Sequence, residues 1–130
     1  MTQTAEEKLV ELAKAYARHR KALRENSQAF RQIGKDHPED DIDLRPYRAD
    51  YIDYESDGGR TAAQWYGWAH AVDTVLDQQD TEDDDPPPRE SLPIYKAAKL
   101  LDERKEINAQ GARIRNRLRI IGDQLLRAEP

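Results

Sequence analysis

Cysteine is absent from this chain of 130 residues. Without thiols there is no disulfide framework, no cysteine nucleophile and no cysteine zinc site, so these classes of protein are excluded. Glycine is scattered apart from the pair Gly58-Gly59, and no phosphate-binding loop or dinucleotide-binding motif occurs. The nucleophile elbow of hydrolases and the H-E-x-x-H zinc motif are also missing. We therefore expect no enzyme, no cofactor and no metal site.

Long hydrophobic runs are lacking too, because no stretch approaches the roughly 18 apolar residues that a membrane span requires. Residues 1–8 are polar and acidic, unlike a secretory signal. We expect no membrane partner and a cytoplasmic protein, of a bacterium or of an infected host cell. Only 37% of the residues are hydrophobic while 36% are charged, which is typical of extended helices or of an oligomer.

What the sequence does contain is two stripes of residues at helical spacing. In both, the positions advance alternately by three and four residues, the rhythm of helices that pack along a narrow seam. Since each stripe needs a partner, the best partner of each is the other. The predicted fold is all-α, a long antiparallel, coiled-coil-like helical hairpin with a short third helix. The stripes are Leu9, Leu12, Tyr16, His19, Leu23, Asn26, Phe30, Ile33 and Ala97, Leu100, Arg104, Ile107, Gly111, Ile114, Leu118, Ile121, Leu125.

In an antiparallel pair, facing residues have numbers that add up to a constant. With a constant of 130, aliphatic residues face one another, His19 faces Gly111, and Asn26 faces Arg104. A shift by one heptad would place His19 on Leu118, at a cost on the order of a few kcal/mol. The first register is therefore predicted, and its polar layers help to fix it.

Capping residues predict the ends of the first helix, about 4–33. Thr4 and Glu7 have the spacing of a capping box. Gly34 can adopt the left-handed conformation that closes a helix.

The rest of the chain divides by composition within what we treat as a single helical domain, 1–130. A second helix, about 61–79, follows an acidic and aromatic segment and should bury Trp65 and Trp68. Residues 80–90 read DTEDDDPPPRE, whose charges and prolines predict a solvated linker. A third helix spans about 92–127, with Ser91 as its cap.

Charge is distributed unevenly, with seventeen acidic and five basic side chains in residues 34–91 and mildly basic flanks. In a hairpin, the acidic stretches that flank the middle segment lie at the same end. That end, with its tyrosines, is predicted to bind a basic partner. The alternative is that acidic loops only keep the protein soluble. The predicted partner-binding residues are Asp36, Glu39, Asp40, Asp41, Asp43, Tyr47, Tyr51, Tyr54, Asp80, Glu82, Asp83, Asp84 and Asp85.

These features favour a non-enzymatic protein–protein interaction module. One concrete form is a virus-encoded inhibitor that mimics nucleic acid, with carboxylates in place of phosphates, against a host defence nuclease or a CRISPR complex. The partner would be a basic protein or a nucleic-acid-binding machine. Because Leu101, Ile120 and Leu126 widen the apolar face of the last helix, we also expect a homodimer.

The alternative function is a nucleic-acid-binding helical hairpin that uses a girdle of basic residues. Alternate positions on a helix splay apart, several of these cations can pair with Glu11, Glu25 or Asp123, and no aromatic residue is interleaved to stack on bases. Direct nucleic-acid binding is therefore the second choice. The girdle consists of Lys14, Arg18, Arg20, Arg113, Arg115, Arg117 and Arg119.

The histidines are compatible with a metal site, but we favour the simpler interpretation that they lie on a solvated face or in the packed seam. His70, Asp73 and Asp77 could share one helical face as ligands. A metal site usually requires a third strong ligand from another element, and only the unanchored His37 or a loop carboxylate could supply it, so a solvated face is favoured. His19 is expected to fill space in the seam.

Overall fold

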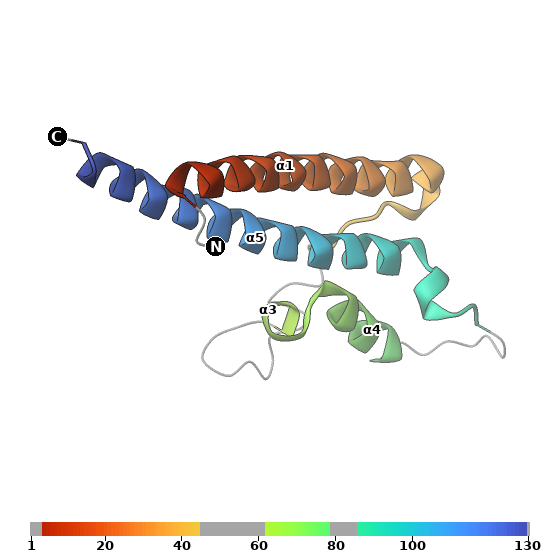
Figure 1. Cartoon of the computed structure of the whole chain (residues 1–130). Helices are drawn as coiled ribbons and strands as arrows, with labels where there is room; N and C mark the ends of the chain where they lie inside the picture. Colours follow the sequence, from red (N-terminus) through yellow and green to blue (C-terminus); the bar gives the residue numbers. More distant parts are fainter. Residues whose placement is uncertain (1–3, 45–61, 79–85, 130) are drawn as a thin grey trace. The chain divides into compact units, whose positions relative to one another are not determined.

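The computed structural model describes residues 4–44, 62–78 and 86–129. Every element in this part of the chain is helical, and together the elements form the predicted all-α fold. Two long helices, α1 and α5, make an antiparallel hairpin, and short helices come between them in sequence (Figure 1). The elements are α1 (Ala5–Asp36), the 3-10 helix η1 (Pro38–Asp40), α3 (Ala62–Tyr66), α4 (Trp68–Gln78), the 3-10 helix η4 (Arg89–Ser91) and α5 (Pro93–Arg127).

The chain divides into two compact units. Unit 1 comprises Met1–Ser27 and Arg104–Pro130, and unit 2 comprises Gln28–Glu103. Each long helix therefore contributes to both units, and each unit is described by itself. Among the described residues, no helix combines the length and the apolar character needed to cross a membrane.

The start of α1 follows the prediction, but its end does not. The amide of Glu7 donates to Thr4 Oγ1 at 3.1 Å, which confirms the cap. Gly34 does not close the helix, because α1 continues to Asp36. His37 then leaves the helical region, with φ −132° and ψ 60°. The residue before a proline is disfavoured in the α conformation, so Pro38 rather than Gly34 decides where α1 ends.

One helix was predicted over 61–79, and this prediction is wrong, since Gly67 separates α3 from α4 with φ +97°. The carboxylate of Asp102 in α5 accepts hydrogen bonds from the backbone amides of Trp68 and Ala69, the second at 3.0 Å. A Cβ on Gly67 would lie 2.8 Å from Asp102 Oδ2. The break therefore allows a distant carboxylate to cap α4, where it also meets the positive end of the helix dipole.

The seam of unit 1 has the predicted register. Its buried residues in α1 lie one heptad apart at Leu12, His19 and Asn26. Gly111 of α5 faces His19 so closely that a Cβ there would overlap the imidazole. The guanidinium of Arg104 donates to the hydroxyl of Ser27, the neighbour of Asn26.

The seam of unit 1 is narrower than the heptad pattern suggests. Leu9 and Tyr16, predicted to face α5, remain 38% and 37% exposed. On α5, Ile121 is buried, but Ile120 and Leu126 are 43% and 66% exposed. Two helices alone touch along one line, so the residues beside that line stay open to solvent.

The core of unit 2 brings α1, α4, α5 and the segment after η1 together. Leu44, Val72, Ala97 and Ala98 are buried, and Phe30, Ile33, Ile42, Trp68, Ala69, Leu76, Ile94, Tyr95 and Leu101 pack against them. A second, smaller cluster joins Ala63 and Ala71 to Trp68. Trp68 therefore packs as predicted. Trp65 does not, since it is 49% exposed.

Ser91 does not cap α5 as predicted. Its hydroxyl donates to the carbonyl of Pro88 at 2.6 Å and so stabilises the η4 turn. Part of the predicted linker is therefore a short 3-10 helix. Residues 80–85 of the predicted linker lie outside the described residues.

Candidate functional site

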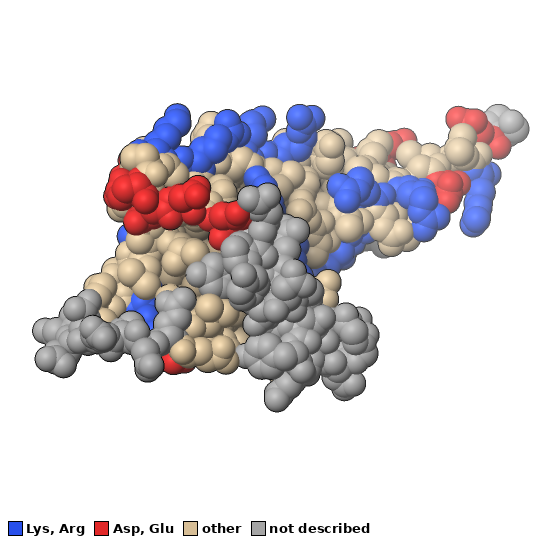
Figure 2. Space-filling model, turned by 180° about the vertical axis from the view of Figure 1, so that it is seen from behind, with Lys and Arg blue, Asp and Glu red and all other residues tan. Residues whose placement is uncertain are grey.

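The first candidate surface begins at the last residue of α1 and continues through η1 in unit 2. We call it the acidic segment: Asp36, Glu39, Asp40, Asp41 and Asp43. The first four are exposed and Asp43 is half-buried. Pro38 starts the η1 turn, and Asp41 leaves it with a left-handed φ of 43°, so the chain folds back on itself at this point. Figure 2 shows acidic side chains gathered in a red patch at the end of the hairpin where α1 passes into this turn.

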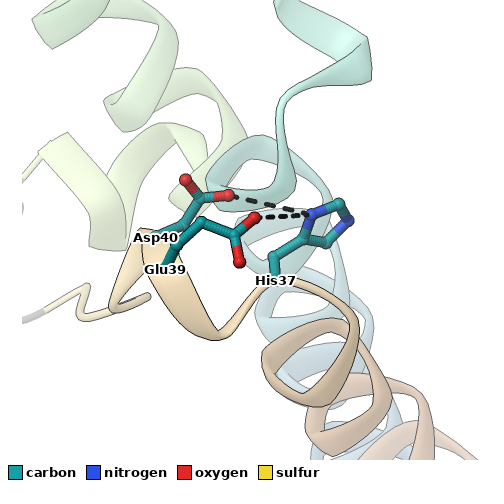
Figure 3. Close-up of side chains that lie close together, drawn as sticks. All are labelled: His37, Glu39 and Asp40. Carbon is teal, nitrogen blue, oxygen red and sulfur yellow. Dashed lines mark ion pairs between the residues drawn. The ribbon is translucent and has the colours of Figure 1, made fainter.

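His37 lies within the acidic segment. Its Nδ1 is 3.9 Å from a carboxylate oxygen of Glu39 and 3.8 Å from one of Asp40 (Figure 3). These distances are too long for hydrogen bonds, so the attraction is weak. The three groups offer ligand atoms within 4.8 Å of one another. His37, Glu39 and Asp40 come from one short turn, and both carboxylates are exposed. We therefore interpret this group of side chains as a charged surface.

The structure brings together only part of the predicted acidic surface. Of the acidic segment, Asp36 ends α1, Glu39 and Asp40 belong to η1, and Asp41 and Asp43 follow η1, all within unit 2. The other predicted partner-binding residues lie outside the described residues. They are Tyr47, Tyr51, Tyr54, Asp80, Glu82, Asp83, Asp84 and Asp85.

The two carboxylates of the metal interpretation are engaged by an arginine. Arg89 Nη1 lies 3.0 Å from Asp73 Oδ1, and its Nη2 pairs with Asp77. The hydrogen bond from Arg89 lowers the pKa of Asp77. The hydrogen bonds that Arg89 makes to Asp77 and Asp73 raise the pKa of Arg89. His70 instead lies against Tyr66, with ring centroids 5.1 Å apart. Sequence reasoning missed Arg89, because it was assigned to the solvated linker.

All seven residues of the predicted basic girdle are exposed and belong to unit 1. Two of them pair with carboxylates: Arg113 lies 3.9 Å from Glu106, and Arg119 lies 3.8 Å from Asp123. The pairing with Asp123 was predicted. The girdle is therefore partly neutralised on α5.

Three girdle residues line an open groove of about 750 Å³ in unit 1, which we call the basic groove. Lys14 and Arg18 of α1 and Arg117 of α5 share its walls with Lys8, and Glu11 and Gln124 also line it. The remaining lining residues are apolar: Leu12, Ala15, Ile120 and Ile121. Sequence reasoning missed Lys8 and the groove, although the spacing of Lys8, Leu12 and Ala15 places them on one helical face.

The two units carry charge of opposite sign. Unit 1 has 13 Lys and Arg against 7 Asp and Glu, a net charge of +6. Unit 2 has 8 against 19, a net charge of −11. The charge of −5 for the whole chain conceals this contrast.

No protein-family model, curated protein or solved structure matches this chain.

Proposed function

We propose that this protein is a non-enzymatic protein–protein interaction module that binds a basic partner through unit 2. The observation that carries the proposal is the exposed acidic segment within a unit of net charge −11. A field of one sign attracts a partner of the other sign and speeds their encounter. The proposed surface also takes in Tyr47, Tyr51 and Tyr54 and the acidic residues of 80–85, because clustered tyrosines supply binding energy at the centre of an interface.

A virus-encoded inhibitor is the specific form that we propose. Carboxylates on its surface would occupy the positions of phosphates in the groove of a host defence nuclease or CRISPR complex, in the cytoplasm of a bacterium or an infected cell. The density of acidic residues in a small helical chain supports this form. It predicts that the inhibitor and DNA compete for one site on the partner.

The test combines capture of a partner from bacterial lysate with kinetics on the captured protein. A variant with Asp40, Asp41, Asp83 and Asp84 changed to Asn should associate about tenfold more slowly at low salt, since steering depends on charge. The matched control changes Glu6, Glu25, Glu106 and Glu129 to Gln, which alters the net charge equally within unit 1. Equal association rates for the two variants would refute the proposal.

Nucleic-acid binding through the basic girdle is the second candidate, because all seven cations of the girdle are exposed and belong to unit 1. An electrophoretic shift assay with short DNA and RNA distinguishes it. Binding that falls steeply with salt and is lost in the variants Arg115→Ala and Arg117→Ala would favour this candidate over the first.

We further propose a homodimer, on the basis of the exposed aliphatic side chains beside the seam. Leu126 is 66% exposed, and a second copy would cover it. Sedimentation equilibrium should then report a dimer for the wild type and a monomer for Leu126→Glu. A wild-type monomer at all concentrations would contradict this proposal.

A further inference from the structure

The basic groove of unit 1 combines two kinds of surface, cationic and aliphatic. Its cations come from both helices, with Lys8, Lys14 and Arg18 on α1 and Arg117 on α5. None of the four forms an ion pair with a carboxylate among the described residues. The groove also exposes aliphatic surface, since Ile120 is 43% exposed. A ligand that covers this groove gains both charge pairing and apolar burial.

We propose that the basic groove is a docking site for an acidic amphipathic helix of a partner protein. Such a helix places apolar residues on one face and glutamates beside them. This arrangement complements an apolar floor whose walls carry four cations against the one carboxylate of Glu11. From Lys8 to Arg18, α1 rises roughly 15 Å, about three helical turns, which provides room for two or three apolar anchors.

Charge complementarity separates this occupant from the alternatives. A second copy that docked through the same groove would bring four cations against four, which repel one another. Nucleic acid would satisfy the cations but would leave the half-exposed aliphatic side chain of Ile120 without an apolar partner. An acidic amphipathic helix satisfies both.

This site is independent of the proposed function, because it lies in unit 1 and accepts a partner of the opposite charge. Loss of binding at the acidic segment would leave it intact. The protein then has two docking surfaces, an acidic one in unit 2 and a basic one in unit 1.

A designed peptide tests the proposal on the full-length protein. The probe is a fluorescein-labelled helix of about 18 residues, with leucine at heptad positions a and d and glutamate at e and g. One control peptide has the same composition in scrambled order, and another has lysine in place of glutamate. Fluorescence anisotropy should show that the probe binds at least about tenfold more tightly than either control, because only the probe offers both kinds of contact.

Variants locate the binding. The double variant Lys14→Glu, Arg117→Glu should weaken binding of the probe at least about tenfold, since it reverses charge on both walls. The matched control is Arg20→Glu, Arg24→Glu, two exposed positions of α1 outside the groove, which should have a much smaller effect. Ile120→Ser should also weaken binding while leaving charge unchanged. Circular dichroism checks that each variant keeps its helical content.

Several results would overturn the proposal. Equal binding of the scrambled peptide would show a response to charge alone. Displacement of the probe by a DNA duplex that binds more tightly, with the same sensitivity to the double variant, would assign the groove to nucleic acid. A wild-type dimer that the double variant converts to a monomer would assign it to a second copy. Absence of probe binding would reject the site.

Discussion

The imidazole of His19 occupies the space that a side chain at Gly111 would need. A Cβ on Gly111 would lie 2.5 Å from Nε2 and 3.1 Å from Nδ1 of that ring. His19 is buried, and its Nδ1 has no hydrogen-bond partner. The contact between His19 and Gly111 is therefore steric, and it fixes the register of α1 along α5 in unit 1.

Gly111→Ala should therefore destabilise the protein despite the better helix propensity of alanine. Overpacking costs about 1–3 kcal/mol, and replacing a helical glycine returns about 1 kcal/mol. We expect a net loss that urea unfolding monitored by circular dichroism can measure. In a His19→Ala background the overlap is absent, so the same change should stabilise. The same loss in both backgrounds would argue against the contact.

The second prediction concerns the start of α4. Asp102→Ala should lower the free energy of unfolding by about 1–2 kcal/mol, because two backbone amides of α4 lose their acceptor. Urea unfolding measures the loss, and Glu103→Ala at the exposed neighbouring position is the control. Gly67→Ala should be destabilising as well, since Gly67 has a positive φ and Asp102 lies against it. An Asp102→Ala protein as stable as the control would refute the cap.

The third prediction is a pH dependence. Arg89 holds the pKa of Asp77 below its ordinary value of 3.8. A carboxyl group with a lowered folded-state pKa stabilises the fold above its ordinary pKa, and this contribution is lost as the pH falls through the folded-state pKa. Arg89→Gln should therefore raise the pKa of Asp77, which carboxyl carbon NMR titration can follow. A titration of Asp77 that is unchanged in Arg89→Gln would exclude the pair.

The fourth prediction tests what ends α1. Pro38→Ala removes the restriction on His37, so residues 37–40 should gain helical character. Backbone chemical shifts measure this directly. Gly34→Ala is the comparison and should leave the end of α1 at Asp36, because nothing lies within 4 Å of a Cβ at that position. If Gly34→Ala instead lengthens the helix, the proline account is wrong.

For the candidate surfaces, the sequence predicted which residues carry the charge better than it predicted which of them lie together in the fold. The members of the acidic segment are neighbours in the sequence, so they stay close together whatever the rest of the fold does. The basic girdle was predicted as a band, yet only Lys14, Arg18 and Arg117 line the groove. Which cations share a groove depends on the rotation of α1 against α5, and the residue type alone does not specify that rotation.

The heptad spacing by itself determined the two long helices, their antiparallel pairing and the facing of His19 and Gly111. A period repeated over some thirty residues marks one face of each helix, and polar interruptions permit one alignment of the two. Only the tertiary structure decided the break at Gly67, the arginine that joins Asp73 to Asp77, and the groove with its apolar floor. Each of these depends on contacts between residues distant in the chain, and a local pattern carries no information about such contacts.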